Sequence, residues 1–253
     1  MNSIKMNQLT KYFSLLIPGV LALGFTTEAQ AVVDFNQYND PSLFVDISAT
    51  GTALGLSDDG TASINNTVGN PLIPAGTITV SNNGNIQSGS SDNEFDNTSL
   101  PYADFSTALM PFWDDIDSET GNVYWEETVV GGIDTLIVQW DNRPHFPNTG
   151  DATFQLQLFE TGSTLARFAY TDVDFGSFGF DFGASATIGY QASSTVADQY
   201  SFNSPVLANG DVIDVTAVPF EFSPTLGLLF VGAGLGIKKG KDYLAKSKKV
   251  DLD

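Results

Sequence analysis

Residues 152–170 read ATFQLQLFETGSTLARFAY and carry the clearest structural signal in the chain. Apolar and polar residues alternate on both sides of the turn-forming stretch 161–164. A period of two residues is typical of strands with one buried face, because successive side chains point to opposite sides of a sheet. The pattern predicts a β-hairpin with its apolar face in the core.

The same period recurs along the rest of the chain. Residues 123–130 and 133–140 flank Gly131-Gly132, a dipeptide that suits the positive φ angles of tight hairpin turns. Further alternating stretches or strong turn signals occur at 43–47, 78–86, 184–190 and 212–215. Many short strands without a helical period predict an all-β fold, an antiparallel β-sandwich over residues 32–218.

Composition narrows the classes of function. The 253 residues include 30 acidic and 10 basic side chains, one histidine and no cysteine, with a net charge of -20. Such a charge repels phosphate backbones, so no nucleic acid is expected as a partner. The lack of cysteine excludes disulfides, thiolate metal sites and cysteine nucleophiles. The acidic surface suits a setting that contains divalent cations, or it serves solubility alone, and both interpretations stay open.

Residues 1–31 have the features of a cleavable signal peptide. Two lysines precede an apolar stretch at 13–25, and Ala29 and Ala31 form a small-x-small triplet before Val32. The apolar stretch is short for a membrane span. We therefore predict a signal peptide helix that directs export and is removed by cleavage between Ala31 and Val32.

The C-terminal segment 219–253 combines a short motif, an apolar run and a basic tail. Pro219-Phe220-Glu221 precedes the uncharged run 225–237, and lysines are concentrated between 238 and 249. Positive charge after an apolar run stays on the cytoplasmic side of a membrane, so this order indicates a stop-transfer segment. It predicts a single C-terminal transmembrane helix, with residues 32–218 facing outward as an ectodomain.

The tail as a whole resembles the PEP-CTERM class of bacterial sorting signals, with Pro219-Phe220-Glu221 where the parent class has Pro-Glu-Pro. The resemblance implies recognition by a membrane transpeptidase of the exosortase type. It also implies removal of the helix and transfer of the protein to the cell surface or matrix. Permanent anchoring in the membrane through the same helix remains an alternative.

A second resemblance rests on an ordered series of motifs. The most specific is Pro111-Phe112-Trp113-Asp114-Asp115. The others are Asp46–Leu54, Val80–Ile86, Leu100-Pro101, Val123-Tyr124-Trp125, Val138-Gln139-Trp140, Ala152–Gln155 and Ala186–Gly189. In this order they resemble the nidogen-type extracellular domain, called NIDO, with the strands that precede it in bacterial surface proteins. The resemblance covers about residues 43 to 192. It implies an extracellular domain associated with cell-matrix adhesion, without established catalytic residues and with an unknown matrix or surface polymer as partner.

The densest acidic cluster predicts a calcium ion. Asp115, Asp117 and Glu119 alternate along the chain beside Asp114, and Gly121 follows. Calcium takes six to eight oxygen ligands and needs a chain that curls around it, which such spacing permits. The spacing differs from that of an EF-hand loop. An exposed acidic hairpin connection without a metal is the alternative.

The sequence shows no clear set of catalytic residues. His145 lies between two prolines, which predicts a loop, and no Gly-x-Ser-x-Gly elbow accompanies it. Acids two residues apart on a strand share one face, so they do not flank a glycosidic bond. Trp113, Trp125 and Trp140 offer a surface for stacking on sugars, although the alternation around Trp140 favours a place in the core.

The sequence therefore divides into a signal peptide at 1–31, an ectodomain at 32–218 and a sorting signal at 219–253. We expect a secreted or cell-surface protein of adhesion or of an extracellular matrix, exported from a bacterium, that is not an enzyme. The alternative function is that of a carbohydrate-binding surface module on the same architecture.

Overall fold

The computed structural model describes residues 33–218, so the predicted signal peptide and sorting signal lie outside the described residues. The described part forms strands joined by turns and two short 3-10 helices, η1 (Pro41–Leu43) and η2 (Asp181–Gly183). None of its helices is long and apolar enough to cross a membrane. The strands are β1 (Val33–Asn39), β2 (Thr52–Ala53), β3 (Thr61–Asn66), β4 (Gly76–Ser81), β5 (Asn85–Ser88), β6 (Thr107–Trp113), β7 (Asn122–Val130), β8 (Ile133–His145), β9 (Thr149–Phe159), β10 (Thr164–Asp172), β11 (Thr187–Ser193), β12 (Val196–Phe202) and β13 (Asp211–Ala217).

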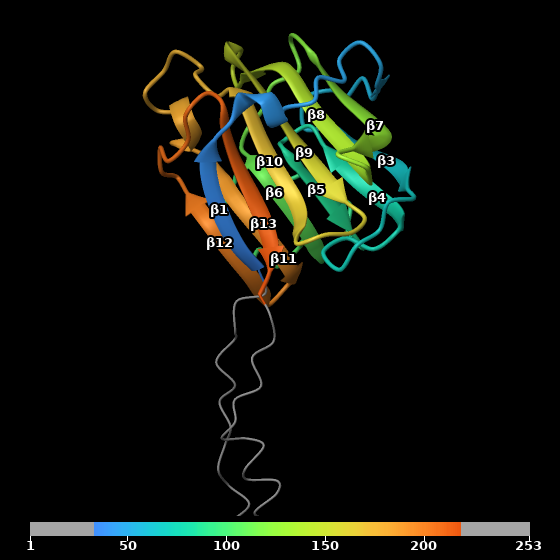
Figure 1. Ribbon diagram of the computed structural model, residues 1–253. Helices are drawn as coiled ribbons and strands as arrows, with labels where there is room; N and C mark the ends of the chain where they lie inside the picture. Colours follow the sequence, from blue (N-terminus) through green and yellow to red (C-terminus); the bar gives the residue numbers. More distant parts are fainter. Residues whose placement is uncertain (1–32, 219–253) are drawn as a thin grey trace, which may run out of the picture. The chain divides into compact units, whose positions relative to one another are not determined.

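The strands form two antiparallel sheets. The seven-stranded sheet has the order β1-β13-β10-β9-β8-β7-β2, and the six-stranded sheet has the order β12-β11-β6-β5-β4-β3. The two sheets pack face to face as the layers of a sandwich, visible in Figure 1. The all-β antiparallel architecture predicted from the alternating pattern is confirmed.

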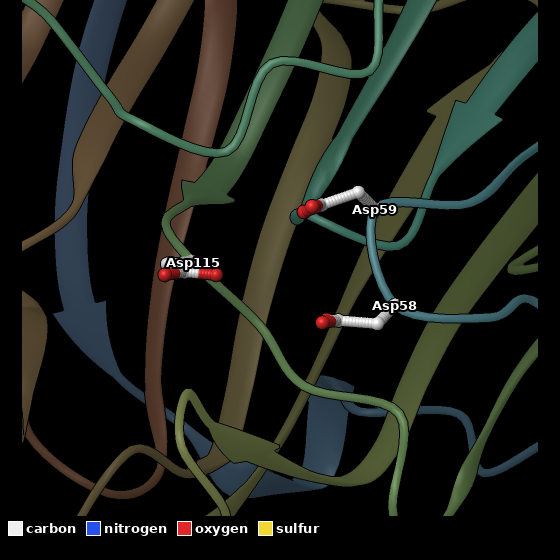
Figure 2. A group of neighbouring side chains, drawn as sticks. All are labelled: Asp58, Asp59 and Asp115. Atoms are coloured by element: carbon white, nitrogen blue, oxygen red, sulfur yellow. The ribbon is translucent and has the colours of Figure 1, made fainter.

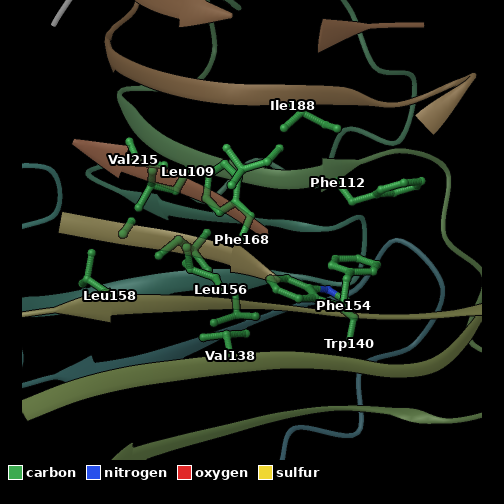
Figure 3. Packing of buried hydrophobic residues seen from close by; sticks show 14 of the residues in the cluster. Leu109, Phe112, Val138, Trp140, Phe154, Leu156, Leu158, Phe168, Ile188 and Val215 are labelled. Atoms are coloured by element: carbon green, nitrogen blue, oxygen red, sulfur yellow. The ribbon is translucent and has the colours of Figure 1, made fainter. Parts of the chain in front are cut away.

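The core lies between the sheets and is built from the inward side chains of both. Leu136, Val138 and Trp140 of β8 alternate along one face, as predicted, and are fully buried. Figure 3 shows Val138 and Trp140 in this core. The rings of Trp140 and Phe154 stack with centroids 5.1 Å apart and an interplanar angle of 13°. The Trp140 indole also donates a hydrogen bond to the Ser81 carbonyl at 2.9 Å, which ties the two sheets together.

The predicted hairpins are confirmed. β7 and β8 pair from Asn122↔Asp141 to Val130↔Ile133 around Gly131-Gly132, and both glycines have positive φ angles, 60° and 85°. β9 and β10 pair across the turn 160–163. The period-two pattern locates these strands correctly because hairpin pairing and turn chemistry are local.

The outer face of the larger sheet differs from the expectation. Gln139, Gln155 and Gln157 point away from the core, yet all three are fully buried. The segment 43–47 covers them and is not a strand, contrary to its alternating pattern. Its backbone bonds to amide side chains: the Val45 N–H donates to Gln155 Oε1 and the Val45 carbonyl accepts from Gln155 Nε2, both at 3.0 Å.

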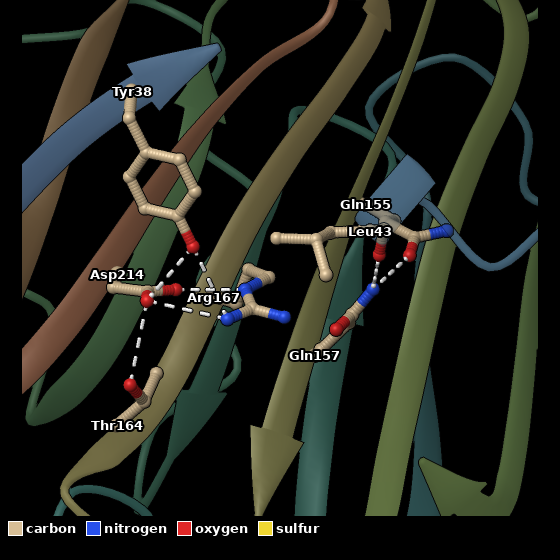
Figure 4. Close-up of polar contacts among 7 residues, drawn as sticks. All are labelled: Tyr38, Leu43, Gln155, Gln157, Thr164, Arg167 and Asp214. Carbon is tan, nitrogen blue, oxygen red and sulfur yellow. Dashed lines mark hydrogen bonds and ion pairs between the residues drawn. The ribbon is translucent and has the colours of Figure 1, made fainter. Parts of the chain in front are cut away.

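Two more glutamine contacts complete this covering. The Ile47 N–H donates to Gln139 Oε1 at 2.9 Å, and the Leu43 carbonyl accepts from Gln157 Nε2 at 2.7 Å (Figure 4). The prediction of one buried face on β9 is therefore wrong, since both faces are buried. Alternation at 43–47 reflects contact with a sheet surface rather than membership of a sheet.

The six-stranded sheet has a similar covering. The Tyr102 N–H donates to Gln191 Oε1, and the Tyr102 carbonyl accepts from Gln191 Nε2, both at 2.8 Å. Beneath this segment a small second core forms on the outer face of the sheet, from Phe105, Ala108, Met110 and Trp113. Trp113 is thereby buried on the side of the sheet opposite to Trp140.

Both ends of the described chain lie at one end of the sandwich. β1 and β13 run side by side, and Val33 pairs with Ala217 (Figure 1). β8 reaches His145 and β10 reaches Asp172 at the opposite end, which we call the distal end. The connections there carry most of the residues considered below.

Candidate functional site

The distal end brings together connections that are far apart in the sequence. The Asn82 N–H donates to the Gly60 carbonyl at 2.8 Å, and the Phe146 N–H donates to the Asp115 carbonyl at 2.9 Å. Ile116 forms an isolated bridge with His145. The segments that meet are 57–60, 82–84, 114–120 and 142–149, and we refer to them as the distal loops.

Three carboxylates converge in the distal loops (Figure 2). One carboxylate oxygen from each of Asp58, Asp59 and Asp115 lies within 4.8 Å of the others. Asp58 and Asp59 come from the turn before β3, and Asp115 follows β6. Closely spaced carboxylate oxygens are the ligands that calcium prefers, so these residues could hold such an ion.

The surroundings of Asp115 and Asp58 disfavour the ionised forms of these two carboxyl groups. Partial burial, together with the charges of Asp59 and Asp58, raises the pKa of Asp115 to about 6, against the opposing effect of His145. Burial and the neighbouring Asp59 also raise the pKa of Asp58. A bound cation would relieve this repulsion, which is the electrostatic condition that a metal site requires.

Asn83 holds two of the converging segments in place. Its side chain is fully buried in the turn between β4 and β5. Its Nδ2 donates to Asp59 Oδ1 at 2.9 Å, and its Oδ1 accepts from the Ile116 N–H at 3.1 Å. One amide side chain thus sets the position of Asp59 relative to the segment that carries Asp115.

His145 is buried at the end of β8, contrary to the prediction of an ordinary loop position. Its Nε2 lies 3.4 Å from Asp114 Oδ1, and its Nδ1 donates to the Phe146 carbonyl at 2.6 Å. Its ring stacks on Phe180 with centroids 3.6 Å apart and planes 13° apart. The flanking prolines do not keep the residue out of the sheet, because β8 is long and pairs irregularly with β9 near this end.

The charge of His145 depends on Asp114. Burial by itself lowers the pKa of His145, but the hydrogen bond and the charge of Asp114 outweigh it, so the pKa lies above its usual value. Asp114 Oδ2 also accepts from the Ser185 hydroxyl at 2.6 Å. The carboxylate therefore stands between the serine and the imidazole. In a hydrolytic relay the imidazole stands between the other two groups.

The predicted calcium ligands separate in the structure. Asp114 faces His145 and Ser185, whereas Asp115 faces Asp58 and Asp59. Asp117 is buried, and its two oxygens accept from the backbone N–H groups of Ser118 and Asn148. Glu119 is exposed. Of the four predicted ligands, Asp115 belongs to the group that could hold a metal, and calcium binding itself stays a prediction.

Arg143 contributes a buried positive charge within the distal loops. Its guanidinium contacts the Leu56, Thr120 and Gly121 carbonyls and Asn82 Oδ1, while its Nε has no hydrogen-bond partner among the described residues. Burial lowers the pKa of Arg143, and the charges of Asp117 and Asp58 oppose that effect. Arg143 thus joins the backbone of several loops and partly balances the acidic charge.

The sequence did not single out Asp58 and Asp59. The available signal is the dipeptide Asp59-Gly60, which is typical of a tight turn and says nothing about a distant partner. Only the pairing of β3 with β4, and of β6 with β5, carries this turn to Asp115.

The three tryptophans do not form an exposed platform. Trp113 and Trp140 are fully buried, which confirms the preferred assignment to the core. Trp125 is partly buried and packs against the main core. Stacking on a sugar needs an accessible ring face, so these residues give the carbohydrate-binding alternative no support.

Comparison with known proteins finds a match to a family model. A family model described as NIDO related matches residues 34–221, which is most of the chain. No curated protein matches, and no solved structure matches. The match covers every described strand except the first residue of β1 and includes all of the distal loops.

Proposed function

The chain belongs to the NIDO-related family, and on that premise we propose that it is an exported, non-enzymatic protein of cell-matrix adhesion or of an extracellular matrix. A NIDO-related domain fits an extracellular or cell-surface location. The acidic, cysteine-free composition agrees with a domain that is soluble without disulfides. The proposal concerns a binding or structural role, with the partner polymer left open.

The observation that carries the proposal is the pairing of Val33 with Ala217. Because β1 and β13 lie side by side, the chain enters and leaves the domain at the same end. The distal loops, with Asp58, Asp59 and Asp115, lie at the other end. A tether at either end of the chain would therefore present the distal loops away from the attachment point.

The proposal includes the processing inferred from the sequence. A signal peptidase would cleave between Ala31 and Val32. A transpeptidase of the exosortase type would recognise Pro219-Phe220-Glu221, the membrane would hold the following apolar run, and cleavage would release the domain to the surface or matrix. The alternative is a permanent tether through the same apolar run.

Mapping both ends of the native protein tests the processing. We expect mass spectrometry of fractionated cells to find a start at Val32 and an end near Phe220. Glu221→Ala should leave the tail attached, whereas the neighbouring Ser223→Ala should be processed normally. Recovery of Asp253 in the membrane fraction of the unaltered protein would instead show a permanent anchor.

A deletion strain tests the role in adhesion. We expect loss of attachment to surfaces or of matrix cohesion, restored by the full-length gene. Unchanged attachment and matrix would contradict the proposed function. Turnover of a glycan by the purified protein, abolished by one acid substitution, would contradict its non-enzymatic part.

A further inference from the structure

The edge of the larger sheet is only partly covered along β7. β2 consists of two residues, Thr52 and Ala53, which pair with Trp125 and Tyr124. Within residues 33–218, no strand pairs with Glu126–Val130 on that side. The second half of β7 is therefore an open sheet edge.

Hydrogen-bonding groups point outward from this open edge. The Leu54 N–H donates to the Val123 carbonyl at 2.8 Å on the β2 side, which fixes the direction of the alternating backbone groups. By the same alternation the N–H and carbonyl groups of Glu127 and Val129 point away from β8. In the described part of the chain, no backbone hydrogen bond outside the β7–β8 ladder reaches these two residues. Unpaired groups in a row are a template for an added strand.

An acidic cavity opens beside the same edge. It has a volume of about 310 Å³, and Glu127, Asp134 and Glu160 contribute carboxylates to its lining. Val68 and Val129 contribute apolar surface, and Val129 is 62% exposed. Asp134 of β8 pairs with Val129 of β7, and the N–H of Glu160, the residue after β9, donates to the Asp134 carbonyl at 3.0 Å. The strands β7 and β8 and the residue that follows β9 therefore supply one wall.

The cavity carries uncompensated negative charge. Glu127 accepts from the N–H and hydroxyl of Thr67, while no hydrogen bond or ion pair to the carboxylates of Asp134 and Glu160 is found among residues 33–218. Within residues 33–218 the only lysine or arginine residues are Arg143 and Arg167. Arg167 is paired with Asp214, and Arg143 is bound in the distal loops. Neither of them neutralises the cavity.

We propose that an extended peptide segment of a partner protein adds as a strand beside Glu126–Val130 and inserts a lysine side chain into the acidic cavity. The outward N–H and carbonyl groups of Glu127 and Val129 would bind the peptide backbone. The aliphatic stem of lysine would pack on Val68 and Val129, and its ammonium would reach the carboxylates. This site lies away from the distal loops and goes beyond the proposed function, because it depends on neither export nor a bound metal.

Charge argues for a basic partner and against a second copy of the domain. The described residues of another copy offer only Arg143 and Arg167 as basic groups, and both are already engaged. Two domains with this acidic composition would also repel each other. A partner with a basic residue in an extended segment meets both requirements of the site.

Binding of synthetic peptides to the full-length protein tests the proposal. The probe is a labelled nine-residue peptide of alternating threonine and valine with a central lysine, measured by fluorescence anisotropy. Matched peptides carry norleucine or glutamate at the centre. We expect the lysine peptide to bind at least tenfold more tightly than either. Equal binding of the three peptides, or no binding of the lysine peptide, would overturn the proposal.

Variants separate the contribution of the edge from that of the cavity. Val129→Pro removes an outward N–H without removing a bond to β8, so binding should fall at least tenfold while the melting temperature changes little. Asp134→Asn with Glu160→Gln should reduce lysine-peptide affinity to that of the norleucine peptide, while the exposed control Asp151→Asn should not. If Val129→Pro unfolds the protein, a lysine peptide with N-methylated backbone amides replaces it and should not bind.

Two further results would overturn the proposal. Lysine-peptide binding that persists in Val129→Pro would show that the edge is not used. Self-association of the full chain in sedimentation that Val129→Pro abolishes would show that a second copy occupies the edge.

Discussion

The Nε2 atom of His145 lies 3.4 Å from Oδ1 of Asp114, and both side chains are buried at the distal end of the sandwich. The pair joins β8 to the segment that follows β6, and Ser185 adds a third connection through the same carboxylate. The single histidine of the chain therefore has a structural environment that ties separate loops together.

Breaking this pair should destabilise the domain. His145→Gln or Asp114→Asn alone should cost about 3 kcal/mol, because each leaves a buried polar group without its partner. The free energy of unfolding of the double variant should fall by less than the sum of the two single decreases. Each single decrease already includes the loss of the same contact, so their sum counts this contact twice. Urea unfolding of the four proteins at pH 6 measures this. Additive losses would show that the contact contributes nothing specific.

Calcium should stabilise the protein through Asp115, Asp58 and Asp59. With millimolar calcium the melting temperature should exceed that in chelator, because the ion binds the native state. Asp115→Asn or Asp58→Asn should remove most of the increase. Glu119→Gln serves as the control and should keep it, since Glu119 is exposed and lies outside this group. Identical melting curves with calcium and with chelator would exclude the site.

The raised pKa of Asp115, about 6, predicts a pH dependence in the presence of chelator. The folded state binds this proton more tightly than the unfolded state does. The contribution of Asp115 protonation to the free energy of unfolding is therefore fully present below about pH 4 and is lost as the pH rises through 6. Between pH 5 and 7.5, the wild type should lose more stability than Asp115→Asn. Parallel pH profiles of the two proteins would contradict this assignment.

The glutamine contacts should hold their two covering segments independently. Gln155→Leu removes both bonds to Val45 and should speed amide exchange in 43–47 without affecting the segment around Tyr102. Gln191→Leu should do the reverse. Each change should cost about 1–3 kcal/mol, because buried backbone groups lose their partners. Hydrogen exchange by mass spectrometry distinguishes the two, and faster exchange of both segments in either variant would show that they are coupled.

Gly84 should tolerate no side chain. Its φ is +70°, and an added Cβ would lie 1.7 Å from the Phe112 carbonyl oxygen. Gly84→Ala should cost about 4 kcal/mol or more, since backbone on both sides must move. Gly131→Ala is the matched control, with φ +60° and open space around the site, and should cost about 1–2 kcal/mol. Equal decreases in melting temperature for Gly84→Ala and Gly131→Ala would show that the turn 82–84 rearranges to accommodate the added Cβ.

Sequence and structure agree where the interactions are local. The alternation on β7 to β10 and the Gly131-Gly132 turn are sufficient to locate two hairpins, because pleating and turn geometry depend on neighbouring residues. The expectation from the sequence and the structure differ at residues 43–47 and at His145. A period of two reports that one side of an extended segment is covered, but not whether a strand or a row of glutamine amides covers it.

The sequence by itself determined the all-β class, the hairpins and the acidic character, because each of these depends on composition or on residues close in the chain. Only the tertiary structure decided that Asp115 joins Asp58 and Asp59 rather than Asp117 and Glu119, and that half of β7 is left without a neighbour. Both outcomes depend on which distant strands pair. Such pairing is set by packing over the whole sandwich, and no short stretch of sequence contains that information.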